Sequence, residues 1–378
     1  MQFSQDDKRE TFHMPQPSPS RTARTRTRFH GMFGKMAIFL IMAVSLAHQA
    51  HGEQAGPRSV VLSDDRLAGY RPIEQVAGSL RIQGSDTMHP LLTRLSAEFR
   101  RRQPLVTIEV KGGGSAKALA DFLRVSPSDG LKTGHAAQVF LVSSSRELMP
   151  SEIKQFTIRH GYEPVAIPVA VDAVGIYVHR DNPIVGLTLD QVDAMFSTTR
   201  YREYPQEIRT WGQVGLTGGW QTAALQPYGR DRKSGTRTFF QEHVLAGGEF
   251  RTTMQEEPGA ASVILALSQA PLGIAFNGLG LHSTMVRIVP LAEKKDMPFV
   301  APSDATIADQ TYPLRRVLYL YMDKSASTSM APATKEFLTF INSREGQETV
   351  IRAGFFPLPL TQIEQTIAAL AQSPSPAN

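Results

Sequence analysis

The sequence predicts an α/β fold, and three stretches of the chain carry that prediction. Residues 79–83 and 106–110 alternate as short strands do, and each is followed by a small polar turn and then by apolar residues at helical spacing. A third turn-to-helix junction lies at 228–240. The chain has 378 residues, of which 41% are hydrophobic and 20% are charged. This is ordinary globular composition, with room for two domains.

The first two stretches are complete strand–turn–helix units. One runs from 79–83 through Gly84-Ser85-Asp86-Thr87-Met88-His89-Pro90, where proline suits the first helical turn and the Ser/Asp/Thr cluster suits the cap before it. The other runs from 106–110 through Lys111-Gly112-Gly113-Gly114-Ser115. The apolar residues that predict the two helices are Leu91, Leu92, Leu95 and Phe99 in the first and Ala118, Leu119, Phe122 and Leu123 in the second.

The third stretch has the features of an anion site at the start of a helix. Ser234, Gly235 and Thr236 suit a helix N-terminus, where unpaired backbone N–H groups and the positive end of the helix dipole attract negative charge. Arg230 precedes Ser234 by four residues and can make a forked, charge-assisted contact to the same anion. The alternative is an ordinary capped helix beside a solvated basic loop.

Together the three turns predict a site for a small oxyanion. Neither the GxGxxG pattern of dinucleotide sites nor the GxxxxGK[ST] pattern of P-loops occurs. In an open α/β sheet, turns of this kind gather at the carboxyl edge of the strands, where ligands bind. Three helix starts at one edge would form a cage of N–H and O–H donors.

The order of these motifs resembles the periplasmic phosphate-binding proteins of ABC transporters and their wider substrate-binding family. The similarity extends over roughly residues 79–360. Residues 169–178 resemble a strand of that family that crosses between lobes. The other segments that match in order are 182–196, 211–212, 272–276, 312–319 and 346–358. The resemblance implies a two-lobed type II periplasmic binding protein fold that closes on a ligand in the cleft between its lobes.

The resemblance also implies the residues of the site. Thr87 and Met88, with Ser85 nearby, match the contacts of the first loop, and Ser115 matches the hydroxyl of the second. The contacts from the second lobe match Arg230, Ser234, Gly235 and Thr236.

One position departs from the family pattern. Many members carry an acid after the third strand that accepts the proton of hydrogen phosphate, but here Ser144 and Ser145 stand near that place, followed by Arg146. A hydroxyl repels sulfate less than a carboxylate does. Asp86 or Glu147 is an alternative acceptor.

The expected domain organisation has six parts. Residues 1–52 combine a basic region, the apolar run 36–47 and small residues before 52, which is typical of a signal peptide; translation is expected to start at Met32 or Met36. An uncleaved anchor and a basic nucleic-acid arm are the alternatives. A linker (53–78), a first lobe (79–168 with a return segment 310–365), a second lobe (169–309) and a disordered tail (366–378) follow.

Charge and cysteine content narrow the function classes. Seven of the 40 Lys/Arg and three of the 35 Asp/Glu lie in residues 1–52, so 33 basic and 32 acidic residues remain in the rest of the chain. That part is close to neutral, and its charge gives no argument for binding to nucleic acid. The chain has no cysteine, so disulfides and thiolate metal sites are excluded. Histidine spacing indicates no metal site, and no cofactor is expected. Arg315 and Arg316 are interpreted as a charge pair at the start of a strand.

The predicted function is therefore an exported, monomeric, non-enzymatic protein of the periplasm. It captures phosphate or a similar oxyanion and delivers it to the permease of an ABC transporter. One alternative is a binding protein or sensor for sulfate or arsenate. Another, of a different class, is an exported phosphoryl-transfer or hydrolytic enzyme, since anion cages also serve catalysis.

Overall fold

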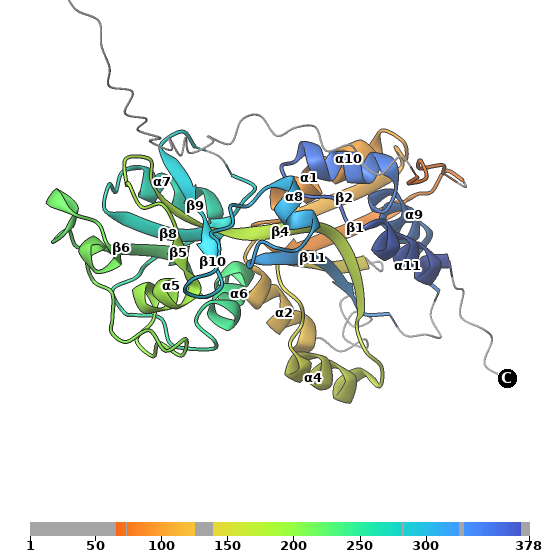
Figure 1. The fold of residues 1–378 in the computed structure, drawn as a ribbon. Coiled ribbons are helices and arrows are strands. Elements are labelled where there is room, and N and C mark those ends of the chain that lie inside the picture. Colours follow the sequence, from red (N-terminus) through yellow and green to blue (C-terminus); the bar gives the residue numbers. More distant parts are fainter. Residues whose placement is uncertain (1–65, 73, 125–138, 282, 325–328, 372–378) are drawn as a thin grey trace, which may run out of the picture. The chain divides into compact units, whose positions relative to one another are not determined.

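The computed structural model describes residues 66–72, 74–124, 139–281, 283–324 and 329–371 (Figure 1). Contacts divide the chain into residues 1–54 and 55–378, and the described residues belong to the second unit. The predicted signal peptide, residues 53–65 of the predicted linker and the last residues of the predicted tail lie outside the described residues. None of the helices in the described part is long and apolar enough to cross a membrane.

The α/β prediction is confirmed by a nine-stranded sheet in the order β2-β1-β3-β11-β4-β8-β6-β7, with β9 also paired to β4. We call the part built on β2, β1, β3 and β11 the first lobe, and the part built on β8, β6, β7 and β9 the second lobe. Both lobes share β4.

The elements of the first lobe are β1 (Gly78–Gly84), α1 (His89–Arg100), β2 (Val106–Lys111), α2 (Ser115–Arg124), β3 (Val139–Ser144), α4 (Pro150–His160), β11 (Arg315–Met322), α9 (Pro332–Ile341), α10 (Arg344–Arg352) and α11 (Leu360–Ala371). The remaining elements are β4 (Val165–His179), β5 (Leu187–Thr188), α5 (Leu189–Phe196), η1 (Trp211–Val214), η2 (Gly218–Trp220), β6 (Gln226–Arg230), α6 (Gly235–His243), β7 (Gln255–Glu257), α7 (Ala260–Ser268), β8 (Gly273–Gly278), β9 (Val286–Val289), β10 (Leu291–Ala292) and α8 (Asp304–Ala308).

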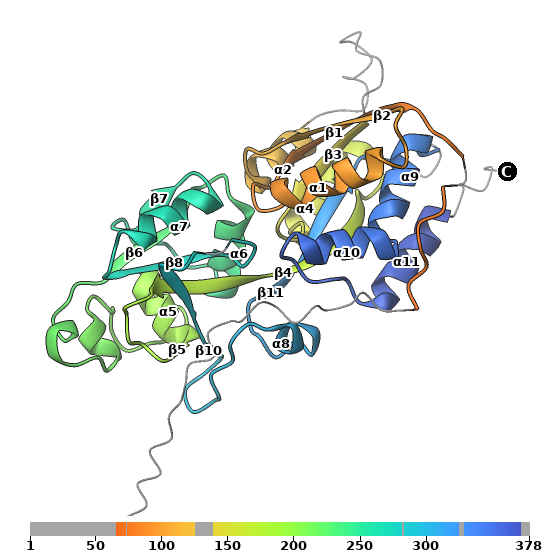
Figure 2. The same cartoon turned by 90° about the horizontal axis from the view of Figure 1, so that it is seen from above.

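Helices lie on both sides of the first lobe's sheet (Figure 2), and each face of the sheet has its own hydrophobic core. Because side chains alternate along a strand, Leu141 of β3 joins the core under α1, α9 and α10, whereas Val142 joins the core under α2 and α4. Leu320 and Tyr321 of β11 divide between the two cores in the same way. Helices on both faces are what buried parallel strands require.

In the second lobe, one large core joins α5, α6 and α7 to the strands β4, β6 and β8. β6 pairs in parallel with β7 and β8, while β8 and β9 run antiparallel to β4. Phe196, Phe240 and Phe276 pack there as a cluster of rings with centroids 4.0–5.7 Å apart. This packing fixes α6 against the sheet, and α6 carries the third predicted helix start.

The long strand β4 joins the lobes. Residues 165–173 pair with β11, and residues 174–178 pair with β8. A third segment approaches the same point, where Val171 and Phe356 form an isolated bridge. The predicted crossing strand, 169–178, lies within β4.

Two stretches differ from what the sequence suggests. Leu67, Tyr70 and Val76, from the region expected as a linker, are buried in the cores, and the Tyr70 hydroxyl donates to Glu336 at 2.6 Å. At the other end, α11 continues to Ala371 and buries Leu370, so helix extends into the region expected as a tail. Around Leu67, Tyr70 and Val76, apolar residues isolated among polar ones give too little periodicity to reveal such packing. In α11, by contrast, Leu360, Ile363, Ile367 and Leu370 do recur at helical spacing.

Candidate functional site

The site is built where three strands end and three helices begin. β1 and β2 lie parallel, and so do β1 and β3, so their carboxyl ends lie at one edge. α1 follows β1 after a four-residue loop, and α2 starts at Ser115 directly after the glycines that follow β2. From the second lobe, α6 starts after β6 with Ser234 as its N-cap. The structure therefore brings the three predicted junctions together.

The first loop is held by its own hydroxyls. Ser85 donates its N–H to the carbonyl and to the hydroxyl oxygen of Ser143, both at 2.9 Å, and its Oγ accepts the N–H of Met88 at 3.2 Å. Ser85 is thus engaged with Met88 and with Ser143 of β3. Between them, Asp86 accepts the N–H of Gly113 at 2.8 Å, which ties the first loop to the second. Thr87 is buried and points toward the second lobe.

Ser115 and Ser145 lie next to each other, whereas Ser144 is engaged elsewhere. The hydroxyl oxygens of Ser115 and Ser145 are 3.3 Å apart, and Ser115 Oγ accepts the N–H of Ser145 at 3.1 Å. Ser144 Oγ donates to the carbonyl of Arg146 at 2.8 Å and accepts its N–H. Of the two predicted serines after β3, the structure therefore brings only Ser145 to the other loops.

The acid expected after β3 has no counterpart there. Arg146 forms two 2.7 Å hydrogen bonds to the carboxylate of Glu152, and Glu147 is exposed and accepts the Tyr319 hydroxyl at 2.7 Å. Of the two alternative acceptors, Asp86 and Glu147, only Asp86 contacts the loops of the site.

On the second lobe, Ser234 and Thr236 have different tasks. Ser234 Oγ accepts the N–H groups of Thr236 and Arg237 at 3.2 and 3.4 Å, as an N-cap does. Thr236 is fully buried, and its hydroxyl lies 3.2 Å from that of Thr87. The first turn of α6 thus presents the Thr236 hydroxyl toward the first lobe.

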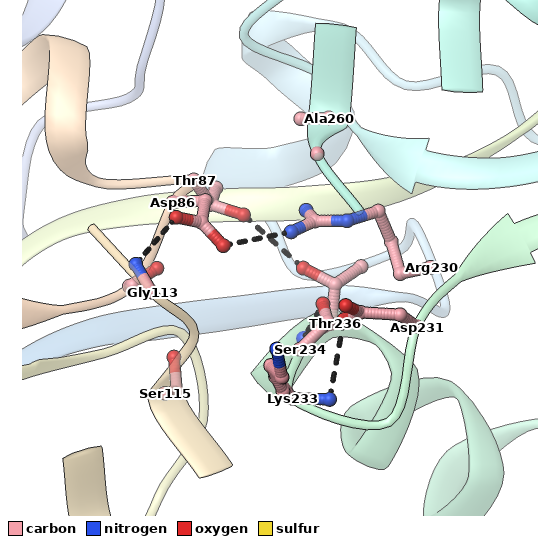
Figure 3. Close-up of polar contacts among 12 residues, drawn as sticks. Asp86, Thr87, Gly113, Ser115, Arg230, Asp231, Lys233, Ser234, Thr236 and Ala260 are labelled. Carbon is pink, nitrogen blue, oxygen red and sulfur yellow. Dashed lines mark hydrogen bonds and ion pairs between the residues drawn. The ribbon is translucent and has the colours of Figure 1, made fainter. Parts of the chain in front are cut away.

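Three contacts join the lobes at this point, and Figure 3 shows two of them, Arg230 with Asp86 and Thr87 with Thr236. Arg230 Nη2 donates to Asp86 Oδ2 at 3.1 Å, the hydroxyls of Thr87 and Thr236 meet, and the N–H of Ala116 donates to the carbonyl of Lys233 at 3.0 Å. Gly235 and Gly114 permit this approach. A Cβ on Gly235 would lie 2.6 Å from Ser115 Oγ, and one on Gly114 (φ 91°) would lie 2.2 Å from the carbonyl oxygen of Lys233.

Arg230 is the principal positive group of the site. Its side chain is 1% exposed, whereas Asp86 is 28% exposed. Burial lowers the pKa of Arg230, although Asp86 and Asp231 act in the opposite direction. Its Nε and Nη1 are buried and have no hydrogen-bond partner among the described residues. A buried guanidinium with two unused donors is suited to a small anion.

Sequence reasoning missed a second charged layer under the hydroxyls. Arg315 and Arg316 begin β11, as the sequence predicts, but Arg316 is more than a charge at a strand start: it is buried, binds Asp172 and donates to Thr236 Oγ1 at 3.1 Å. Nothing local in the sequence signals this, because the partners are 80 and 144 residues away. Among the described residues, no group of three or more His, Cys, Asp or Glu side chains can hold a metal ion.

Comparison with known proteins gives the class first. The family model of the PBP superfamily domain matches residues 71–345. The chain therefore belongs to the PBP superfamily.

Within that superfamily, the chain is similar to the phosphate-binding protein PstS of Pseudomonas aeruginosa, with 38% identity over 312 residues that cover 82% of this chain and 93% of that protein. The protein of the same name from Bacillus subtilis is 25% identical over 330 residues, which cover 86% and 94%.

Solved structures of similar fold include an ABC-type phosphate transport receptor from Vibrio cholerae, with a TM-score of 0.56, 20% identity, and coverage of 74% of this chain and 100% of that one. A phosphate-binding protein from Stenotrophomonas maltophilia gives a TM-score of 0.54 at 15% identity and covers 77% and 93%. These likenesses confirm the predicted two-lobed type II periplasmic binding protein fold.

Proposed function

We propose that the protein binds phosphate between its two lobes and delivers it to the permease of an ABC importer. The observation that carries the proposal is Arg230, buried where three loop-to-helix junctions meet, with the guanidinium nitrogens Nε and Nη1 unpartnered among the described residues. A dehydrated dianion needs several donors and a positive partner to offset the loss of its hydration. The names of the relatives, phosphate-binding proteins, agree with this.

Each predicted site residue except Ser144 has a role in the proposal. Arg230 neutralises charge, and the hydroxyls of Ser115, Ser145, Thr87 and Thr236 donate to the oxygens. Gly235 brings the start of α6 close to the anion. Ser85, Met88 and Ser234 hold the two helix starts in place, since their hydrogen bonds close the caps of α1 and α6. Ser144 takes no direct part, because its hydroxyl binds the backbone of Arg146.

Asp86 is the group that would favour a protonated oxyanion. Its carboxylate lies against Arg230 and Gly113, and ionised carboxylates accept but do not donate hydrogen bonds. Hydrogen phosphate offers a proton to such an acceptor, whereas fully ionised sulfate meets an unpaired negative charge. The acid missing after β3 is thus replaced by one on the loop after β1. Arsenate, which is also protonated, remains a ligand under this proposal.

The hydrogen-bond partners of the site serines favour a binding protein over an enzyme. The hydroxyls of Ser115, Ser145 and Ser234 contact other hydroxyls and main-chain N–H groups, and none of these is a base that activates a nucleophile. The relatives from Pseudomonas aeruginosa and Bacillus subtilis are binding proteins by name. An exported phosphatase or esterase would be revealed by turnover of chromogenic substrates.

Location and assembly complete the proposal. The basic and apolar pattern of residues 1–52 directs export to the periplasm, where the protein acts as a monomer until it meets the permease. Determining the N-terminus of the secreted protein checks the cleavage, and size-exclusion chromatography with light scattering checks the monomer.

Replacement of Arg230 tests the binding site itself. Arg230→Met removes the charged donor and keeps an apolar stem, so phosphate affinity should fall by about 1.5–3 kcal/mol, the range for a hydrogen bond to a charged group. Arg232→Met, in the same loop but exposed, is the matched control and should bind as wild type does. Calorimetric titration that finds equal affinity for Arg230→Met and wild type would refute the assignment.

A further inference from the structure

Beneath the site lies an ion pair on the two strands that connect the lobes. Arg316 of β11 and Asp172 of β4 are directly opposite in the antiparallel pairing. Arg316 donates from Nε and Nη2 to Asp172 Oδ2 at 3.0 and 2.7 Å. The side chains are 2% and 1% exposed, so this is an interior ion pair and not a surface one.

The same guanidinium reaches the start of α6. Arg316 Nη1 donates to Thr236 Oγ1 at 3.1 Å, and its Cζ lies 5.4 Å from the centre of the Phe239 ring. One side chain thus contacts a crossing strand and the helix whose first turn faces the other lobe.

The chemistry of this contact makes Thr236 Oγ1 an acceptor toward Arg316. A guanidinium has five donors and no acceptor, so Thr236 Oγ1 must accept from Arg316. The single proton of Thr236 is then free to be donated on the other side. There its oxygen lies 3.2 Å from Thr87 Oγ1, and either hydroxyl can be the donor. If Thr236 donates to Thr87, the proton of Thr87 remains; if Thr87 donates to Thr236, the proton of Thr236 remains. Either route leaves a hydroxyl proton directed into the junction.

Asp172 explains how a second arginine is tolerated so close to Arg230. The positive charge of Arg316 disfavours the charged form of Arg230. Asp172 Oδ2 lies 2.7 Å from Arg316 Nη2 and compensates the charge of the guanidinium. The pair therefore offers Thr236 a group that can only donate, while its net charge stays small. A buried pair of this kind is weak evidence for added stability, so a role in specifying polarity is the better reason for it.

We infer that Asp172 and Arg316 are positioning residues, which commit the hydroxyl pair of Thr236 and Thr87 to donating a proton toward a bound oxyanion. The inference rests on the proposed function. If it holds, residues on the strands that join the lobes belong to the site as well as those on the loops. The site would then also disfavour ligands that need a hydrogen-bond acceptor beside Thr236.

A double-mutant cycle tests it by calorimetric titration with phosphate. In the wild-type background, Thr236→Val should weaken binding at least about tenfold, as expected for a hydrogen bond to a charged group. In the Asp172→Asn/Arg316→Met background, binding is already weaker, and Thr236→Val should add less than about twofold. Equal fold-changes in the two backgrounds would overturn the inference, because a merely structural role of the pair gives additive effects.

Three measures keep the test decisive. The control is Arg315→Met. Arg315 is next to Arg316 in the chain but lines a separate cavity with Ile307 and Leu358, so this variant should leave the Thr236→Val effect unchanged. Affinities too weak to titrate are obtained from the rise in unfolding temperature with phosphate concentration. If the paired variant does not fold, Arg316→Lys replaces it.

The lysine variant tests the inference independently, because an ammonium also only donates. Thr236→Val should then keep an effect of at least about fivefold, and an effect below about twofold would overturn the inference. Wild-type protein that binds no phosphate would overturn the proposed function and this inference together. If the wild-type protein binds phosphate but the effects of the substitutions on affinity are additive, only the inference is overturned.

Discussion

Adding one methyl group at Gly235 tests whether the lobes close on each other as the structure shows. A Cβ there would lie 2.6 Å from Ser115 Oγ, 2.7 Å from Ser115 Cβ and 2.7 Å from Ser145 Oγ. Ser115 and Ser145 belong to the first lobe and Gly235 to the second. The backbone of Gly235 is not among those with positive φ, so alanine is compatible with the helix itself.

The magnitude follows from the size of the clash. Ordinary carbon contacts lie at about 3.5–4.0 Å, so the loops must separate by roughly 0.8 Å or more. Overpacking of this kind costs about 1–3 kcal/mol, which is roughly a 5- to 150-fold loss in affinity. The cost applies only when the lobes are closed. In the absence of phosphate, Gly235→Ala should therefore keep the free energy of unfolding or raise it slightly, because alanine favours helix.

The assay is calorimetric titration with phosphate together with chemical unfolding in its absence. Gly219→Ala is the matched control, because a Cβ at Gly219 meets nothing within 4 Å. It should bind as wild type does. Wild-type affinity for Gly235→Ala would refute the reasoning, since it would mean that the start of α6 does not approach Ser115 when phosphate is bound.

Three further predictions concern neighbouring groups. Asp86→Asn keeps the shape of the side chain but removes its charge, so the preference for phosphate over sulfate should fall at least about tenfold in competition titrations; an unchanged ratio would exclude Asp86 as the acceptor. Ser144→Ala should leave phosphate affinity within about twofold, because its hydroxyl binds the backbone of Arg146; a larger loss would place it at the anion. Burial alone would raise the pKa of Glu152, but hydrogen bonds from Arg146 and the Met149 N–H outweigh it and hold the pKa below its usual value. A depressed pKa stabilises the fold above the unfolded value, near 4.5, and this contribution is lost as pH falls through the folded pKa. Glu152→Gln should thus be less stable than wild type at pH 7, with a difference that shrinks below about pH 4 in unfolding curves; a constant difference would contradict this.

Much of the site could be predicted because its signals are local. A cap residue, a small turn and an apolar helical face lie within a few residues of one another, so the starts of α2 and α6 can be recognised from Ser115 and Ser234. Arg230 precedes Ser234, the N-cap of α6, by four residues. The gathering of these turns at one edge follows from parallel strand order, which the alternation of strands and helices implies.

The parts that were missed depend on contacts between distant residues. Arg230 and Asp86 are 144 residues apart, and so are Arg316 and Asp172. A sequence shows that such charges exist but not where they point. The Tyr70–Glu336 contact, across 266 residues, is a further case, since a tyrosine in a polar stretch gives no periodic signal.

The measurement that bears most directly on the proposed function is calorimetric titration of the anion-stripped protein with phosphate, alone and in excess sulfate. We expect phosphate binding that sulfate leaves unchanged, because Arg230 and the hydroxyls hold the dianion while Asp86 accepts its proton. Equal competition by sulfate would contradict the role of Asp86. The absence of heat with phosphate would contradict the proposed function itself.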